Sequence, residues 1–564
     1  TLYTWIAAMT CSSILLLTVL YWQSARCKQL GMMTWQQLQG WWTAVDSEVP
    51  QLQQLFSLLS VVVQTAALCA IYCMLVLLPV YAVCSAVNGT YTYQYAWSLS
   101  AAYLSGEASF AAEAVFLLGL MLLCIVCLRV FLFRTPSLSV PSDELVVVIS
   151  TNTTTYRWYL LFFIVTVLNF SVVLGVNIAY VIIALSQSGK ALTATQTALA
   201  VFKVAFNSGC SPMLLRWASQ RFLGAQVSAS GFVSVQLIVS IVNNIFIPCL
   251  VVAIISPSCF YNIFESVDDV TSSYTYQGKC INVDPYSVNS LKCIEQEIVV
   301  AKTSYNPPFT YSYQCSSSFV TYYAPAFVIM CILAGFAIPL GQVVLQRLHS
   351  RAVAGTRWFA LLDLVLPRVL KPVQENPTRS EYMFFNNAGQ QLVTVLTYLG
   401  LLLTFGAVFP PLALCLALTI VSIIVFARLK VGRLLVQARE QGRAKEYARI
   451  LEHECAGISN SSGGAALVTH AVRGICCFAC GFYTLFLFDT LGDAQGLSGA
   501  YWVLIVCPTV LPVALGLWQL HTWWYWRRPS AAEGGSTMDK SEEGTELTAV
   551  TTTKSPMISA DSVA

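Results

Sequence analysis

Apolar residues occur along most of this chain in long stretches that are separated by shorter polar connections. A helix of about 20 apolar residues crosses the roughly 30 Å hydrocarbon core of a bilayer, and only helices and closed barrels satisfy every backbone polar group there. About eleven stretches are long enough, at residues 3–22, 55–83, 111–133, 158–185, 195–217, 231–256, 321–346, 391–408, 410–428, 465–489 and 497–524. The pattern predicts an all-α, polytopic transmembrane helical bundle with about 11 spans.

Charge distribution predicts how the bundle is oriented. Lys and Arg concentrate in cytosolic connections of membrane proteins, and here 24 of the 30 basic residues lie in one alternating set of connections or at adjoining span ends. The other set holds only Lys190, Lys279, Lys292 and Lys302. We therefore expect the N-terminus outside and the C-terminus inside. The net charge of +3 is no sign of nucleic-acid binding, because the basic residues line a membrane face and are expected to contact anionic lipids.

Composition supports a membrane protein and divides the chain into segments. Hydrophobic residues make up 57% of the chain and charged residues only 10%, which is unusual for a soluble protein. Residues 1–528 form the predicted transmembrane domain. Within it, 428–456 is expected to be a basic cytosolic helix that extends the ninth span. Residues 529–564 are rich in Ser, Thr and Glu and predict a disordered cytosolic tail.

The longest outside connection, 257–320, contains four cysteines, at Cys259, Cys280, Cys293 and Cys315. An even number of cysteines in an extracellular segment predicts two disulfides, with three pairings possible. The sequon at Asn88 also falls in an outside connection and is a predicted glycosylation site. The sequons at Asn152 and Asn460 fall inside, and we expect them to stay unmodified.

Polar residues within three consecutive spans are the most informative chemistry of the chain. Such residues are costly in lipid and usually face the interior of a bundle or a hydrated cavity. Each span carries its polar residues near one helical face, so we expect the three faces to meet. The candidates are Asn169 and Asn177 in the fourth span, Gln196, Lys203 and Asn207 in the fifth, and Gln236 and Asn243 in the sixth.

Lys203 has two interpretations. Its ammonium group needs a carboxylate, a carbonyl, an anion or water, and no Asp or Glu occurs in spans four to six. One interpretation is a hydrated pathway or a pocket for an anion or lipid headgroup, with the Asn side chains as neutral ligands. In the other, Lys203 extends to an interface and the amides hold helices together.

Catalytic signatures are missing from the sequence. It has no His-Glu-x-x-His, no phosphate-binding Gly-Lys-Ser/Thr loop, no Gly-x-Ser-x-Gly elbow and no dinucleotide-binding Gly pattern. The cluster Cys476, Cys477 and Cys480 lies within a span and lacks ligand partners. We expect no enzyme activity, no cofactor and no metal site.

Three short motifs carry a family resemblance: Phe202-Lys203 with Asn207 and Pro212, the loop end Tyr311 to Cys315, and Phe405-Gly406 leading to Pro410-Pro411. They resemble the C-terminal multi-span membrane region of very large protist and algal cell-surface proteins. Those proteins are adhesin- or receptor-like and have Cys-rich ectodomains. The resemblance implies a module that anchors a larger surface protein in the plasma membrane, with a possible sensing role and an extracellular or membrane protein partner.

The start of the chain fits this expectation, because Thr1 opens directly on a predicted span that begins outside. Anchoring is therefore the first functional prediction. The alternative is an ion channel or transporter that uses the polar seam of spans four to six around Lys203. A seven-span receptor is disfavoured by the number of spans.

Overall fold

The computed structural model describes twelve segments of the chain, and all structural statements concern these. They are residues 35–88, 106–134, 155–186, 189–222, 229–255, 272–282, 291–300, 315–352, 356–373, 388–459, 461–495 and 497–527. The first predicted span (3–22), Cys259 and the tail 529–564 lie outside them.

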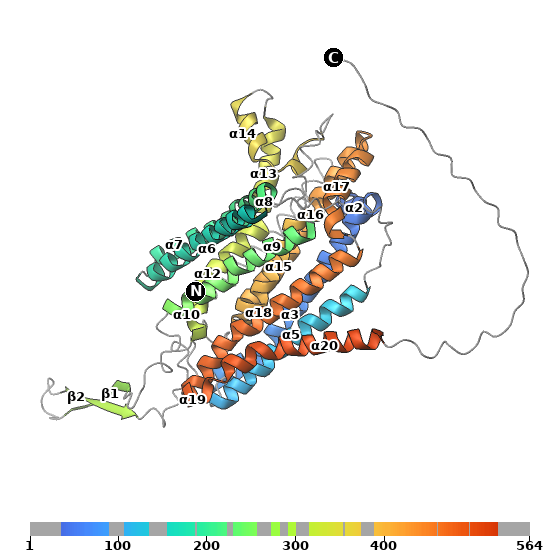
Figure 1. Cartoon of the computed structure of the whole chain (residues 1–564). Coiled ribbons are helices and arrows are strands. Elements are labelled where there is room, and N and C mark those ends of the chain that lie inside the picture. The colour runs from blue at the N-terminus through green and yellow to red at the C-terminus, as the bar shows by residue number, and fades with distance from the viewer. Residues whose placement is uncertain are drawn as a thin grey trace, which may run out of the picture. The chain divides into compact units, whose positions relative to one another are not determined.

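Helices dominate the described residues (Figure 1). Nine of the helical segments found there are long and apolar enough to cross a membrane, and each coincides with a predicted span. They comprise α3 (Pro50–Asn88), α5 (Gly106–Arg134), α6 (Thr155–Ser186), α9–η4–α10 (Ala229–Ile241, Val242–Phe246, Ile247–Ile255), α12–η6–α13 (Cys315–Ile332, Leu333–Ala337, Ile338–Arg351), α15–η9 (Ala388–Leu401, Leu402–Gly406), α16 (Pro410–Glu440), α18 (Ser461–Gln495) and α19 with α20 (Leu497–Ala500, Val503–Arg527).

The fifth predicted span is helical as well, although it is not among those nine. It consists of α7 (Lys190–Ala205), η2 (Phe206–Cys210) and α8 (Ser211–Phe222), where η denotes a π-helical turn. Its polar residues lower its hydropathy, but α7 packs against α12 and α8 packs against α6. The segment is therefore part of the bundle, and the total of eleven spans stays a prediction.

The segment α15–η9 forms the centre of the bundle. About 78% of its apolar window is buried inside the molecule, against 17–56% for the other eight. It packs against α3, α9, α16 and α18, and Figure 1 shows α3, α15, α16 and α18 running side by side. A helix that is buried to this extent tolerates polar side chains, because protein groups surround them.

Two further helices, α2 (Trp35–Glu48) and α14 (Arg357–Val365), lie in connections between the long apolar helices or before the first of them. Helix α2 packs directly against α16. Arg428 of α16 lies over the Trp42 ring at 4.0 Å and pairs with the Asp46 carboxylate at 2.5 Å. Gly432 permits this approach, since a Cβ atom there would lie 1.9 Å from the Trp41 carbonyl oxygen.

The basic segment 428–456 differs from the single helix that we expected. α16 ends at Glu440, and α17 (Ala444–Ser459) begins after a turn at Gly442, whose φ is +75°. This left-handed conformation suits glycine and ends the helix. α17 then packs back against α3 and α15, so the segment is a helix–turn–helix and not one solvated extension.

The connection 257–320, which is predicted to lie outside, contains the two described strands, which the all-α prediction did not include. β1 (Ser272–Asn282) and β2 (Leu291–Val300) pair in antiparallel fashion. A bulge places Gly278 and Lys279 opposite one residue, and the register after it sets Cys280 opposite Cys293. Opposed residues have Cα atoms about 4.5–5.5 Å apart, within the range for a disulfide. The register therefore places Cys280 and Cys293 at a spacing compatible with a disulfide, and the two disulfides stay a prediction.

Contacts divide the chain at Leu511 into two compact units. The described residues of the second unit, 512–527, are the C-terminal part of α20, and several of their apolar side chains are exposed, including Leu517 and Leu520. All of the features below belong to the first unit.

Candidate functional site: a polar cavity within the bundle

Four of the bundle's membrane segments are interrupted by a π-helical turn, at η2, η4, η6 and η9. In the first three, the N–H after the turn bonds to the carbonyl five residues before it, as Ser211 does to Phe206. A π turn inserts one extra residue and changes which side chains face a neighbour. Such turns are rare in proteins overall, and those that do occur are often found at functional sites.

A proline one turn further along the chain contributes to each of these π turns. A proline lacks an N–H group, and its ring clashes with the carbonyl four residues earlier in an α-helix. For Pro212, Pro248, Pro339 and Pro410, the residue four positions earlier lies in η2, η4, η6 and η9, respectively. Pro325 lies in an uninterrupted α-helix, so a proline alone does not create the turn.

Side chains from neighbouring helices bond to backbone carbonyls in two of these turns, η6 and η9. The Ser422 hydroxyl of α16 donates to the Gly335 carbonyl in η6 at 2.5 Å, and Gly335 is four residues before Pro339. The buried Tyr483 hydroxyl of α18 donates to the Leu403 carbonyl in η9. Freed carbonyls in a membrane helix need such partners, and the bundle supplies them.

Asparagines from three helices form a hydrogen-bonded chain, as the polar faces of spans four to six predict. Asn169 of α6 donates to Asn243 Oδ1 at 3.1 Å, and Asn243 donates to Asn207 Oδ1 at 3.5 Å. Asn207 in turn donates to Asn244 Oδ1 at 2.6 Å. The π turn η4 lets the adjacent Asn243 and Asn244 both take part. The expectation that the three faces meet is confirmed.

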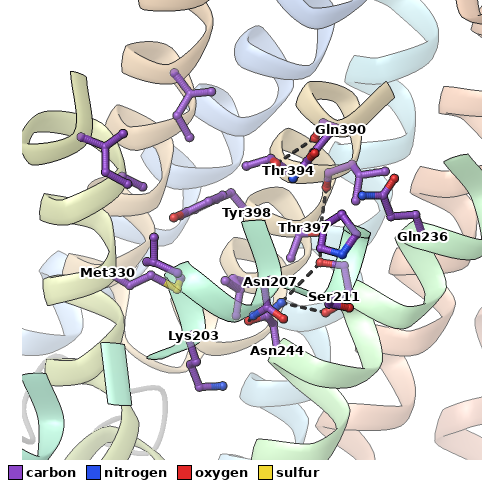
Figure 2. Close-up of a pocket in the computed structure, with 18 residues that line it drawn as sticks. Lys203, Asn207, Ser211, Gln236, Asn244, Met330, Gln390, Thr394, Thr397 and Tyr398 are labelled. Atoms are coloured by element: carbon purple, nitrogen blue, oxygen red, sulfur yellow. Dashed lines mark hydrogen bonds between the residues drawn. The ribbon is translucent and has the colours of Figure 1, made fainter. Parts of the chain in front are cut away.

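A cavity of about 200 Å³ lies beside this chain (Figure 2). It is lined by the helical segments that contain η2, η4, η6 and η9, together with α16. The polar residues that line it are Lys203, Asn207, Ser211, Gln236, Ser240, Asn244, Gln390, Thr394, Thr397 and Tyr398. Within an otherwise apolar bundle, the cavity thus offers hydrogen-bonding groups from several directions.

Lys203 lines one end of this cavity. Figure 2 shows it at the opposite end from Gln390, with Asn207 and Asn244 in between. Its side chain is 2% exposed, and among the described residues its Nζ atom has no hydrogen-bond acceptor. The rings of Tyr323 and Phe327 lie 5.8 and 5.5 Å from Nζ. Aromatic faces attract a cation but do not neutralise it.

A layer of buried aromatic rings continues from Lys203, away from the cavity. Neighbouring rings have centroids 4.8–6.0 Å apart, as expected for close aromatic packing. The layer consists of Phe319, Tyr323 and Phe327 of α12, Phe405 of η9, and Phe482 and Phe486 of α18. Side chains therefore fill the bundle on this side of the cavity.

The predicted site residues separate into three groups. Lys203, Asn207 and Gln236 line the cavity, while Asn169 and Asn243 support it through hydrogen bonds. Two others lie elsewhere. Asn177 bonds to Val173 and to the Tyr323 hydroxyl, and Gln196 bonds to Tyr180.

The seven candidates left out one wall of the cavity, which residues of α15 form. Gln390, Thr394 and Thr397 recur at i, i+4 and i+7 on one helical face, which is also the spacing of Gln236, Ser240 and Asn243. Thr397 also donates to Ser240 Oγ at 2.9 Å, which links this wall to α9. The spacing in the sequence was therefore a usable signal. Among the described residues, no group of His, Cys, Asp or Glu is arranged to hold a metal ion.

Comparison with known proteins adds no relative, because no family model, curated protein or solved structure matches this chain. Functional argument therefore depends on the cavity and the residues around it.

Proposed function

We propose that this protein binds a small polar solute in the cavity and moves it across the membrane, as a channel or transporter. The observation that carries the proposal is a cavity inside an apolar bundle that polar side chains from several helices help to line, bounded by all four segments that contain π turns. Interrupted helices around a polar site are the usual architecture of transporter binding sites. Helices can pack against one another without leaving an open volume and without π turns, so packing alone does not account for these features.

The predicted orientation indicates which side the cavity serves. Gln390 lies near the N-terminal end of α15, and Gln236 lies in the first third of the segment α9–η4–α10. The positive-inside rule puts the N-terminal ends of both segments at the cytosolic face. The aromatic layer lies toward the helix ends that the same rule puts outside, which are the start of α12 and the ends of η9 and α18. This arrangement fits a transporter that is accessible from the cytosol and closed toward the outside.

The test is solute permeation through liposomes that contain the purified chain. Stopped-flow light scattering would record volume recovery after a hyperosmotic step with urea, glycerol, sodium acetate or sodium lactate. We expect at least one solute to enter faster than into protein-free liposomes. Thr397→Phe should reduce that rate at least tenfold, because the ring occupies the cavity between α15 and α9.

Two variants make the result interpretable. Thr509→Phe is the matched control, since Thr509 is exposed on α20 and bonds only to its own helix, at Ile505 and Val506. Thr397→Val keeps the side-chain volume and should retain most of the permeation. The proposal fails if every solute enters at the protein-free rate, or if Thr397→Phe and Thr509→Phe behave alike.

Membrane anchoring of a surface assembly stays a prediction of the sequence resemblance. It requires neither the cavity nor the buried amine of Lys203, so these features favour transport over anchoring. Location in the plasma membrane and an extracellular partner are predictions of the same resemblance.

A further inference from the structure

We infer that the solute is a small uncharged molecule that both donates and accepts hydrogen bonds, such as a polyol or an amide; this inference rests on the proposed function. Its first support is that no charged group reaches the cavity. None of the described lining residues is an Asp or Glu, and Lys203 is the one Lys or Arg among them. Its Nζ atom is fully enclosed against the rings of Tyr323 and Phe327, which do not line the cavity. Figure 2 shows the Lys203 amine pointing away from the other labelled side chains.

An ion would therefore enter this volume without an opposite charge. Transfer of an unpaired charge from water into a protein interior is strongly unfavourable. An uncharged polar solute loses far less, because hydrogen bonds to the walls can replace those that it made with water. A cation is disfavoured further, since the basic side chain of Lys203 lies beside the cavity and no carboxylate in the walls offsets it.

The second support is a pair of polar side chains with free hydrogen-bonding capacity. Gln236 of α9 and Tyr398 of α15 line the cavity, and they are only 4% and 6% exposed. Neither the Gln236 amide nor the Tyr398 hydroxyl has a hydrogen-bond partner among the described residues, yet neither group is fully enclosed. Both groups can donate as well as accept. A solute that also does both would satisfy them.

Two hydroxyl groups of the α15 wall restrict the solute further. Thr394 donates to the Gln390 carbonyl at 2.8 Å, and Thr397 donates to Ser240 Oγ at 2.9 Å. Each hydroxyl hydrogen is used within the protein, so the two threonine oxygens can only accept a hydrogen bond from a solute. A carboxylate or a halide has no hydrogen to donate to them. A polyol or an amide supplies O–H or N–H groups and suits these acceptors.

Size and apolar surface define the class further. The cavity volume of about 200 Å³ is below the roughly 300–1,000 Å³ that is usual for pockets of drug-sized ligands. Met330, Ile338 and Leu401 provide an apolar part of the lining. A molecule of a few carbon atoms that carries hydroxyl or amide groups matches both features, whereas a nucleotide matches neither.

The experiment pairs each uncharged probe with an ion of similar shape. Uptake of radiolabelled urea is compared with guanidinium, and lactamide with lactate, in proteoliposomes that contain valinomycin and potassium to prevent a membrane potential. Rates in protein-free liposomes are subtracted, because the bilayer itself passes uncharged solutes faster than ions. We expect the protein-dependent rate of the uncharged probe to exceed that of the ion at least tenfold in at least one pair.

Substitution of Gln236 tests whether the wall contacts the solute. Gln236→Leu should lower the protein-dependent rate of the uncharged probes at least fivefold. Gln64→Leu is the matched control and should stay within twofold of the wild-type rate, because Gln64 is exposed on α3 and its amide bonds to Ser60 of the same helix. If Gln236→Leu does not fold, Tyr398→Phe takes its place, with Tyr501→Phe at an exposed position as its control.

The possible failures are distinguishable. A measurable protein-dependent rate for guanidinium or lactate within tenfold of its uncharged counterpart would overturn this inference and leave solute transport standing. Wild-type rates of the uncharged probes in both Gln236→Leu and Tyr398→Phe would do the same, because these groups would then not contact the solute. Protein-free rates for all four probes and for every solute of the first test would overturn the proposed function itself.

Discussion

Individual polar residues in this bundle are held in place by partners on other helices. Tyr323 and Asn177 are both fully buried, and the Tyr323 hydroxyl donates to Asn177 Oδ1 at 2.9 Å. Asn177 lies eight residues from Asn169 on α6, about 12 Å along the helix axis. It therefore contacts α12 and not the chain of asparagines beside the cavity. Sequence periodicity identified the polar face of α6, but not which neighbour each residue along it meets.

Replacing Tyr323 by Phe should lower the stability of the protein by about 1 kcal/mol, because a buried amide oxygen then loses its donor. Thermal unfolding in a mild detergent is the measurement. Tyr501→Phe is the control, since Tyr501 is 60% exposed and its loss of a hydroxyl should change little. In an Asn177→Leu background, Tyr323→Phe should cost less, as expected for coupled residues. Equal losses in both backgrounds would contradict the interaction.

Elements of the fold differ in how far the sequence predicts them. The long apolar helices follow from hydropathy alone, and nine of them occur as expected. The π turns needed more information: Pro325 produces none, whereas Pro339 does, and Ser422 of α16 satisfies the carbonyl at Gly335. A distant helix therefore decides where a local irregularity forms. The same applies to the break at Gly442, where α17 turns back to pack on α3.

The contact between α2 and α16 gives a test at this scale. Gly432→Ala should destabilise the protein by about 1–3 kcal/mol, because the new methyl group overlaps the Trp41 carbonyl. In an open helix the same change would stabilise by up to about 1 kcal/mol. Gly474→Ala on α18 is such a control, with no neighbouring atom within 4 Å. Thermal unfolding of both variants in detergent should shift in opposite directions, and a stabilised Gly432→Ala would rule out the close contact.

At the scale of the whole molecule, the cavity could not be predicted from the sequence. Its walls come from five membrane segments, and their mutual packing decides that residues as distant as Lys203 and Gln390 line the same volume. The sequence did identify Lys203, Asn207 and Gln236, because isolated polar groups in apolar helices need protein partners. It could not distinguish them from Asn177 and Gln196, which bond to Tyr323 of α12 and to Tyr180 of α6, respectively, and do not line the cavity.

Orientation is the property of the whole molecule on which the direction of transport depends. The outside location predicted for the end of α3 and for 257–320 implies a glycan on Asn88 and a disulfide between Cys280 and Cys293. Endoglycosidase treatment of the native protein should increase its gel mobility, and Asn88→Gln should abolish that shift. Asn152→Gln and Asn460→Gln are controls that should change nothing. Peptide mapping without reductant should recover Cys280 linked to Cys293. A glycan on Asn460 would invert the orientation, and the cavity would then serve the outside of the cell.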